Sequence, residues 1–501
     1  MRLRRKPPAL RALQRYRFAL VLAVAFIIRI VDVSGSPVEL GADELAGLVG
    51  VNNIWAGRAP LVPFFDLRVQ YLPLYGLLET VSTWIFGTNA LGIRLPAVLL
   101  GVVSVAALRW LVFELTESFA LADGSAAIFA VLPWAVDVSR LGWENAAVFP
   151  FLLGGLAALA RGLRRRDSRA VVASGWLFGI GAYSYRAEVF DAVLLAASLG
   201  FADARRARAC RGALIRGVLV AGCTVAPLGI SVARTPHFFW RDANIATFGH
   251  GYTLAAFVTF VHNYLAHFAI VPLFATGDGI LDHGPAYGVL YWWMLPFIIL
   301  GALTAPRVVR PQAATFLYAW LLIYPLGGAL TNDGVPDFPR TMIGAPLFCI
   351  FAAIGLRGVW RALGAAEAGD VRVRTVASGA FALVATLATL DFARAYVYVY
   401  PGASADAFKS GTANLFHTLR TLERGHDRVC FASLDWYNYA TLTDYYLAGS
   451  SLVPIEGIAP DCRLAGSLIV VDEPSKTVPH SHLIAIGQKR NGAIMAYIYE
   501  T

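Results

Sequence analysis

Thirteen apolar segments run along the chain up to residue 394 and limit what it can fold into. A helix of about 20 apolar residues crosses about 30 Å of hydrocarbon. Only 15% of the 501 residues are charged, whereas soluble domains carry about 25%. The sequence therefore predicts a mainly α-helical, polytopic membrane protein. The segments are 17–33, 72–86, 95–115, 119–137, 144–161, 170–185, 187–202, 213–231, 252–274, 287–305, 312–330, 341–360 and 375–394.

The arginines indicate which segments cross the membrane. If all thirteen crossed from a cytoplasmic N-terminus, the basic runs 161–166 and 205–208 would face outward, against the positive-inside rule. If 72–86 and 252–274 instead lie along the outer surface or dip into it, every basic loop returns to the cytoplasm. Both segments contain polar residues that suit interfacial or re-entrant helices. The same clustering explains the formal charge of +9 without a nucleic-acid partner.

The predicted topology has eleven transmembrane helices in the plasma membrane and an outer C-terminus. Two large extracytoplasmic loops, 34–94 and 232–286, hold the membrane-surface helices. We expect a transmembrane catalytic domain at 1–395 and a small extracytoplasmic α/β domain at 396–501.

After residue 395 short apolar runs replace the long ones, and this pattern predicts short strands around a helix. The predicted strands are 428–433, 467–472 and 493–499, with a helix at 436–448. Cys430 and Cys462 lie in this region, and they can form a disulfide if it is extracytoplasmic. The sequence leaves the bonded and the free state open.

An adjacent carboxylate pair, Asp43-Glu44, lies just outside the first predicted span. Carboxylates at a membrane surface are candidates for proton abstraction. The alternative is structural: Asp43 would cap a short amphipathic helix, and Glu44 would complement the dipole of that helix.

Arginines also accumulate at the outer ends of the segments, where the positive-inside bias predicts few. A single one can pair with a carboxylate or reach the lipid headgroups. Together, beside a carboxylate pair, they suggest a site for an anionic group such as a phosphate. They are Arg94, Arg140, Arg186, Arg234, Arg241 and Arg340, with Glu144 and Tyr185 among them.

The order of these features resembles the GT-C membrane glycosyltransferases that use polyprenyl-phosphate sugars. The similar families are protein O-mannosyltransferases and lipid A aminoarabinose transferases. The resemblance covers about residues 15–360. It rests on Asp43-Glu44, Tyr71-Leu72-Pro73-Leu74, Phe86-Gly87, Arg94-Leu95-Pro96, Arg140 to Glu144, and Arg186 to the segment that Arg340 leads.

The resemblance implies an inverting transfer of a sugar to an extracytoplasmic protein, lipid or glycan. Asp43 would be the general base, supported by Glu44. The residues implied to bind the donor phosphate are Arg94, Arg186 and Arg340. Those implied for the sugar or acceptor pocket are Tyr71, Arg140, Glu144 and Tyr185.

The chain departs from these families at Tyr71, where relatives often have Lys or His, and at Gln70, where some have an acidic residue. These departures weaken a phosphate contact at Tyr71 and point away from aminoarabinose as the sugar.

No metal or other cofactor is expected. His262 and His267 are five residues apart, on different faces of a helix, which makes a shared ion improbable. Together with Asp278, Asp282 and His283 they suit headgroup contacts or an acceptor groove better. The rival class is a transporter or lipid flippase without covalent chemistry, for which two similar halves with broken helices are typical. The sequence shows no such internal symmetry.

Overall fold

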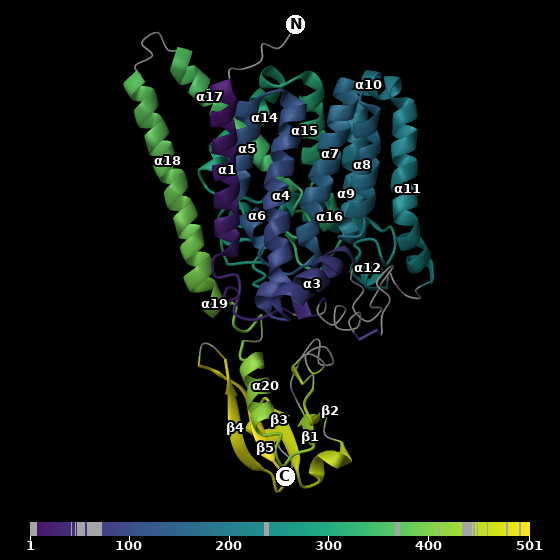
Figure 1. The fold of residues 1–501 in the computed structure, drawn as a ribbon, viewed down its shortest axis with the longest axis vertical. Helices are drawn as coiled ribbons and strands as arrows, with labels where there is room; N and C mark the ends of the chain where they lie inside the picture. The colour runs from purple at the N-terminus through teal and green to yellow at the C-terminus, as the bar shows by residue number, and fades with distance from the viewer. Residues whose placement is uncertain are drawn as a thin grey trace.

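The computed structural model describes residues 8–41, 43–45, 47, 56–57, 73–234, 240–365, 371–408, 410–432, 443, 446–447, 449–457, 459–476, 479–489 and 492–501. Long helices run side by side in a bundle, and a small sheet domain lies at one end of it (Figure 1). The prediction of a mainly α-helical chain with a small C-terminal sheet domain is therefore confirmed.

Each of the eleven predicted spans contains a helix. These helices are α1 (Pro8–Ile30), α4 (Ala90–Thr116), α5 (Phe119–Val131) with α6 (Pro133–Val138), α7 (Val148–Arg165), α8 (Ser168–Gly181), α9 (Arg186–Ala202), α11 (Arg211–Arg234), α14 (Met294–Val308), α15 (Pro311–Ile323) with α16 (Leu326–Ala329), α17 (Gly344–Ala365) and α18 (Val371–Arg394). Within the described residues, five helical stretches are long and apolar enough to cross a membrane, in α4, α7, α11, α17 and α18. The count of eleven spans stays a prediction.

The two segments excluded as spans form shorter helices. They contain α3 (Pro73–Phe86), α13 (Leu254–Ala266) and the π-helical turn η2 (Pro272–Thr276). In Figure 1, α3 and α12 (Trp240–Ile245) lie at the end of the bundle near the sheet domain, whereas α10 (Ala204–Ala209) lies at the opposite end.

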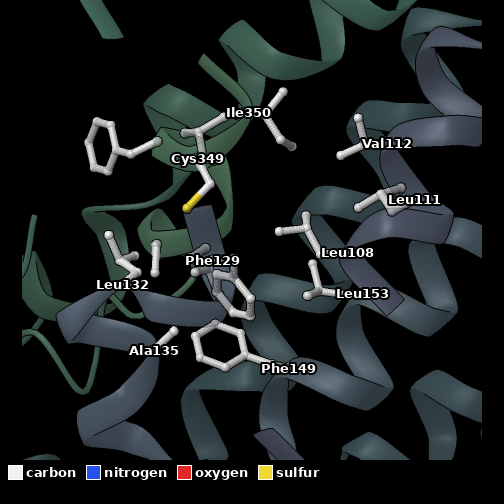
Figure 2. Packing of buried hydrophobic residues seen from close by; sticks show 14 of the residues in the cluster. Leu108, Leu111, Val112, Phe129, Leu132, Ala135, Phe149, Leu153, Cys349 and Ile350 are labelled. Atoms are coloured by element: carbon white, nitrogen blue, oxygen red, sulfur yellow. The ribbon is translucent and has the colours of Figure 1, made fainter. Parts of the chain in front are cut away.

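The core of the bundle joins α4, α5, α7 and α17. Figure 2 shows Leu108 and Leu111 of α4 close to Phe129 of α5 and Leu153 of α7. Phe129 meets Phe149 of α7 edge to face, with 5.3 Å between ring centroids. Between helices in a bilayer such contacts act through close van der Waals packing and not through removal from water. This packing holds the loops at the sheet-domain end in a defined place.

The C-terminal domain is a five-stranded sheet in the order β2-β1-β3-β5-β4. Its strands are β1 (Arg428–Phe431), β2 (Val453–Glu456), β3 (Ser467–Val471), β4 (His482–Gln488) and β5 (Ile494–Glu500). β1 is parallel to β2 and β3, and β5 is antiparallel to β3 and β4. Cys430 and Cys462 form a disulfide.

Three predicted strands correspond to β1, β3 and β5, whereas β2, β4 and the helix α20 (Thr412–Thr421) were not predicted. The predicted helix 436–448 lies mostly outside the described residues. The helix that begins as α18 continues through η3 (Ala395–Val399) and α19 (Tyr400–Ala403). The domain boundary at 395 therefore stays a prediction.

Candidate active site

Arg140 holds the end of α1. The last carbonyls of a helix have no partner within it and need donors from elsewhere. The Nη1 of Arg140 donates to the carbonyls of Ile28 at 2.9 Å, Arg29 at 3.1 Å and Val31 at 2.8 Å. Its Nη2 donates to the carbonyl of Ser36 at 3.2 Å. The Arg140 side chain is buried and turned to this loop, and its predicted place in the sugar pocket stays a prediction.

Arg94 holds the segment that leads to the carboxylate pair. Its Nε and Nη2 donate to Glu44 at 2.7 and 2.8 Å. Its remaining bonds reach the carbonyls of Val33 at 2.8 Å, Pro37 at 3.0 Å and Glu39 at 2.7 Å. Both partners of the ion pair are fully buried. The structure thus gives Arg94 a role in holding this loop, and its predicted contact to the donor phosphate stays a prediction.

Glu44 is fixed on all sides. Besides Arg94, its Oε1 accepts from the Gly142 amide at 2.7 Å and its Oε2 from the Gly41 amide at 2.8 Å. The Leu45 amide in turn donates to the Gly41 carbonyl at 3.0 Å. The Glu44 side chain thus reaches back to the amide three residues earlier, as the carboxylate of a capping box does, although Gly41 has no side chain to return a bond. The capping role that is the alternative for Asp43 stays a prediction.

A cavity of about 360 Å³ lies beside Asp43. Five of the predicted site residues line it: Asp43, Glu144, Tyr185, Arg186 and Arg340. Glu44, Arg94 and Arg140 are not among its lining residues, and Tyr71 lies outside the described residues. The structure therefore brings together side chains that lie almost 300 residues apart in the sequence.

Arg186 is the first residue of α9, after Tyr185 at the cap position. Because α9 leads to α10 at the opposite end of the bundle, its first residue lies at the end near the sheet domain (Figure 1). The first amides of a helix point outward along its axis and favour anions. The N-terminus of α9 and the Arg186 guanidinium thus place positive charge in the same cavity as the Asp43 carboxylate.

Arg340 also lines the cavity, but two carboxylates hold it. Its Nε lies 3.2 Å from the Asp337 carboxylate and its Nη2 donates to Asp333 at 3.1 Å. Nη1 donates to the Thr331 hydroxyl at 2.9 Å. Burial by itself lowers the pKa of Arg340, but these carboxylates outweigh it and raise the pKa. Two carboxylates and a hydroxyl thus hold the Arg340 side chain at the cavity.

Sequence reasoning missed the contribution of His283 to this cavity. Its Nδ1 lies 2.7 Å from the Asp278 carboxylate, and its ring meets Trp143 edge to face at 5.7 Å between centroids. In the sequence, Asp278 and His283 stand only among the residues predicted for headgroup contacts or an acceptor groove.

A second, apolar cavity of about 510 Å³ lies between α8, α9 and α11. Small residues such as Gly175, Gly179 and Ala196 line it. Gly175 and Gly179 also let α8 pack closely on α11, since a Cβ at the first would clash with the Gly217 carbonyl oxygen and one at the second would lie 2.7 Å from Thr224. α9 lines both cavities: Arg186 and Phe190 belong to the polar one, Val189 and Val193 to the apolar one.

The class of protein follows from this arrangement and from comparisons with known proteins. ArnT from Cupriavidus metallidurans bound to undecaprenyl phosphate matches with a TM-score of 0.60 and 13% identity, over 96% of this chain and 97% of that one. The oligosaccharyltransferase AglB from Archaeoglobus fulgidus, in complex with an inhibitory peptide and a dolichol-phosphate, matches with a TM-score of 0.53 and 14% identity. That match covers 90% of this chain and 65% of AglB, so the chain spans less than two thirds of the archaeal enzyme. The fold is that of the GT-C glycosyltransferases.

The family comparison is more specific. Residues 72–230 match the family of dolichyl-phosphate-mannose-protein mannosyltransferases, while no curated protein matches the sequence. Together these findings confirm the predicted resemblance to GT-C glycosyltransferases of the O-mannosyltransferase and ArnT type. They give no support to a transporter or flippase.

Proposed function

We propose that the protein is an inverting glycosyltransferase that moves a sugar from a polyprenyl-phosphate donor to an acceptor outside the cytoplasm. The observation that carries this proposal is the shared cavity of Asp43 and Arg186. A carboxylate suits a general base, and a guanidinium at a helix N-terminus suits a phosphate.

In this mechanism Asp43 takes the proton of the acceptor hydroxyl or amine as that group attacks the anomeric carbon. The bond between this carbon and the phosphate oxygen breaks, and its electron pair stays on the leaving polyprenyl phosphate. The phosphate gains negative charge, which Arg186 and the first amides of α9 stabilise. A positioned base contributes about 10²- to 10⁴-fold.

The neighbouring residues support these two groups. Glu44 positions Asp43 because it lies in the next position of the chain and is itself held by the Gly41 amide and by Arg94. Glu144 and Tyr185 contact the sugar or the acceptor, and Arg340 is a secondary phosphate contact. Tyr71 remains a candidate for the same pocket. We expect the reaction to need no metal or other cofactor.

The apolar cavity supports a lipid donor. It lies against α9, whose first turn also lines the polar cavity, so a phosphate at Arg186 would leave an attached polyprenyl chain beside Val189 and Val193. The ArnT and AglB structures were solved with undecaprenyl phosphate and dolichol-phosphate.

The proposed location is the plasma membrane, with the cavity and the sheet domain on the outer face. Arg205, Arg206 and Arg208 around α10 lie at the opposite end of the bundle, which the positive-inside rule places in the cytoplasm (Figure 1). The Cys430–Cys462 disulfide suits an oxidising compartment at the sheet end.

The test is to compare surface glycans, glycoproteins and lipids by mass spectrometry in cells that carry the wild type or Asp43→Asn. Asp43→Asn should abolish one product while the protein stays folded in the membrane. The mass of that product identifies the sugar. Asp406→Asn is the matched control, because Asp406 is exposed and pairs with Lys489 in the C-terminal region. Identical profiles for wild type and Asp43→Asn would rule out the proposed enzyme.

A further inference from the structure

His283 and Asp278 form a pair that the proposed base and phosphate site do not use. Asp278 accepts from the Ile280 amide at 3.0 Å through Oδ1, and its Oδ2 lies 2.7 Å from His283 Nδ1. Phe338 adds a longer amide contact of 3.4 Å to the same Oδ2. The carboxylate is thus held from its own loop and from the loop before α17, and it orients the imidazole.

The orientation leaves one ring nitrogen for a ligand. Because Nδ1 faces Asp278, a proton on Nδ1 is held there, and Nε2 has no hydrogen bond within the described residues. His283 lines the cavity that also contains Asp43 and Arg186. The Trp143 ring covers one side of the imidazole and restricts its rotation.

We propose that His283 is a further catalytic residue of the transfer, and that its Nε2–H donates a hydrogen bond to the leaving phosphate. This inference rests on the proposed function. The acceptor proton still goes to Asp43, the sugar–oxygen bond still breaks toward the phosphate, and His283 keeps its own proton. A charged donor aimed at a phosphate oxygen is about twice as strong as a neutral one.

The surroundings favour the cationic imidazole. Burial by itself lowers the pKa of His283, but the hydrogen bond and charge of Asp278, and then Asp337 and Asp282, outweigh it and raise the pKa above its ordinary value. The other charged groups around it are Asp137 behind the ring and Asp43, Glu144, Arg186 and Arg340 in the cavity. Because the pKa is raised, the imidazole keeps its charge to a higher pH than an unperturbed histidine and loses it as the pH rises through the raised pKa. Phosphate binding should weaken in the same range.

The experiment measures binding of farnesyl phosphate to the purified full-length protein in detergent from pH 6 to pH 9.5, with farnesol as the phosphate-free control. At pH 6, His283→Gln should bind about tenfold more weakly than the wild type, the size expected for one charge-assisted hydrogen bond. At pH 9.5 the two should bind alike. A purely structural role would instead weaken binding equally at every pH. The phosphate itself titrates near pH 6, so the comparison is always between variants with the same ligand.

Two further variants complete the test. Asp278→Asn should move the loss of binding to lower pH, because the imidazole loses the carboxylate that favours its charge. His250→Gln is the control, since His250 is exposed and does not line the cavity. The inference fails, and the proposed function stands, if His283→Gln binds like the wild type at every pH while Arg186→Gln does not bind. If the wild type itself does not bind farnesyl phosphate, the proposed donor and this inference both fail.

Discussion

Two pairs of arginines near the sheet end of the bundle carry the same charge in opposite surroundings. Arg94 and Arg140 are buried, and their N–H groups bind backbone carbonyls and, for Arg94, Glu44. Arg186 and Arg340 line the cavity that contains Asp43. The excess of arginines at this end of the bundle therefore has two causes: one pair holds the loop before Asp43, and the other pair lines the cavity.

Breaking the buried ion pair should have the largest effect. Arg94→Met leaves the Glu44 carboxylate buried without its partner, which typically costs about 3–5 kcal/mol of stability. Thermal unfolding in detergent measures this loss. The double variant Arg94→Met/Glu44→Met should recover only the part caused by the unpaired charge, because the backbone groups that Arg94 and Glu44 bind stay without their partners. If Arg94→Met unfolds at the wild-type temperature but has lost its activity, Arg94 contacts the donor phosphate and does not serve mainly to hold the loop.

Arg186→Gln should differ from Arg94→Met in what it lowers: the rate of sugar transfer and not the stability of the fold. It removes the charge that faces the leaving phosphate, so we expect sugar transfer to fall about 10²- to 10³-fold, as for the loss of one transition-state donor. Unfolding should stay at the wild-type temperature. Product formation by membranes, measured by mass spectrometry, tests this. Arg186→Lys keeps the charge but not the planar fork, and should retain part of the activity. Full activity of Arg186→Gln would exclude this residue as the phosphate contact.

Arg140→Leu should show that the second buried arginine is structural. The change leaves the end of α1 without its donors and removes the cation 4.6 Å from the Tyr396 ring. Unsatisfied buried acceptors cost about 1–3 kcal/mol, visible as a lower unfolding temperature. Arg234→Leu, at an exposed outer position, should unfold like the wild type. If Arg140→Leu unfolds normally but forms a different product, Arg140 belongs to the sugar pocket after all.

Glu39→Ala should have the smallest effect and tests how the sheet domain is joined to this loop. Glu39 accepts from the amides of Gly411 at 2.6 Å and Ala413 at 3.2 Å, at the N-terminus of α20. Loss of such a cap costs about 0.5–2 kcal/mol. Glu473→Ala is the control, because Glu473 is exposed and its side-chain contacts are to its near neighbours Ser475 and Lys476. If Glu39→Ala and Glu473→Ala unfold at the same temperature, the contact between the sheet domain and this loop does not contribute to stability.

Patterns along the chain were sufficient for much of the fold. Apolar length and the positions of arginines predicted a helix in each span, and they separated out the segments that form α3 and α13. β3 was predicted because all five of its residues are apolar or small and fully buried. β4, in contrast, is an edge strand with mostly exposed residues, so its sequence has no strong alternation to detect.

The candidate site was predicted in part, since five of its named residues line the cavity. Sequence patterns could not predict which groups Arg94 and Arg140 bind. The positive-inside rule indicates on which side of a membrane an arginine lies, but the direction of the side chain depends on which carbonyls the fold leaves without donors. His283 was noticed in the sequence, yet only the structure places it beside Asp43.

The sequence by itself determined the class of the protein and the end of the bundle at which its polar residues gather. It also singled out Asp43 as the candidate base. Hydropathy and charge decide how segments sit in a bilayer, and this does not depend on how the helices pack in detail. Only the tertiary structure decided which outward arginine serves the loop and which faces the cavity. The reason is that a guanidinium binds a buried carbonyl and a phosphate oxygen through the same N–H groups, and contacts between distant helices select one of the two.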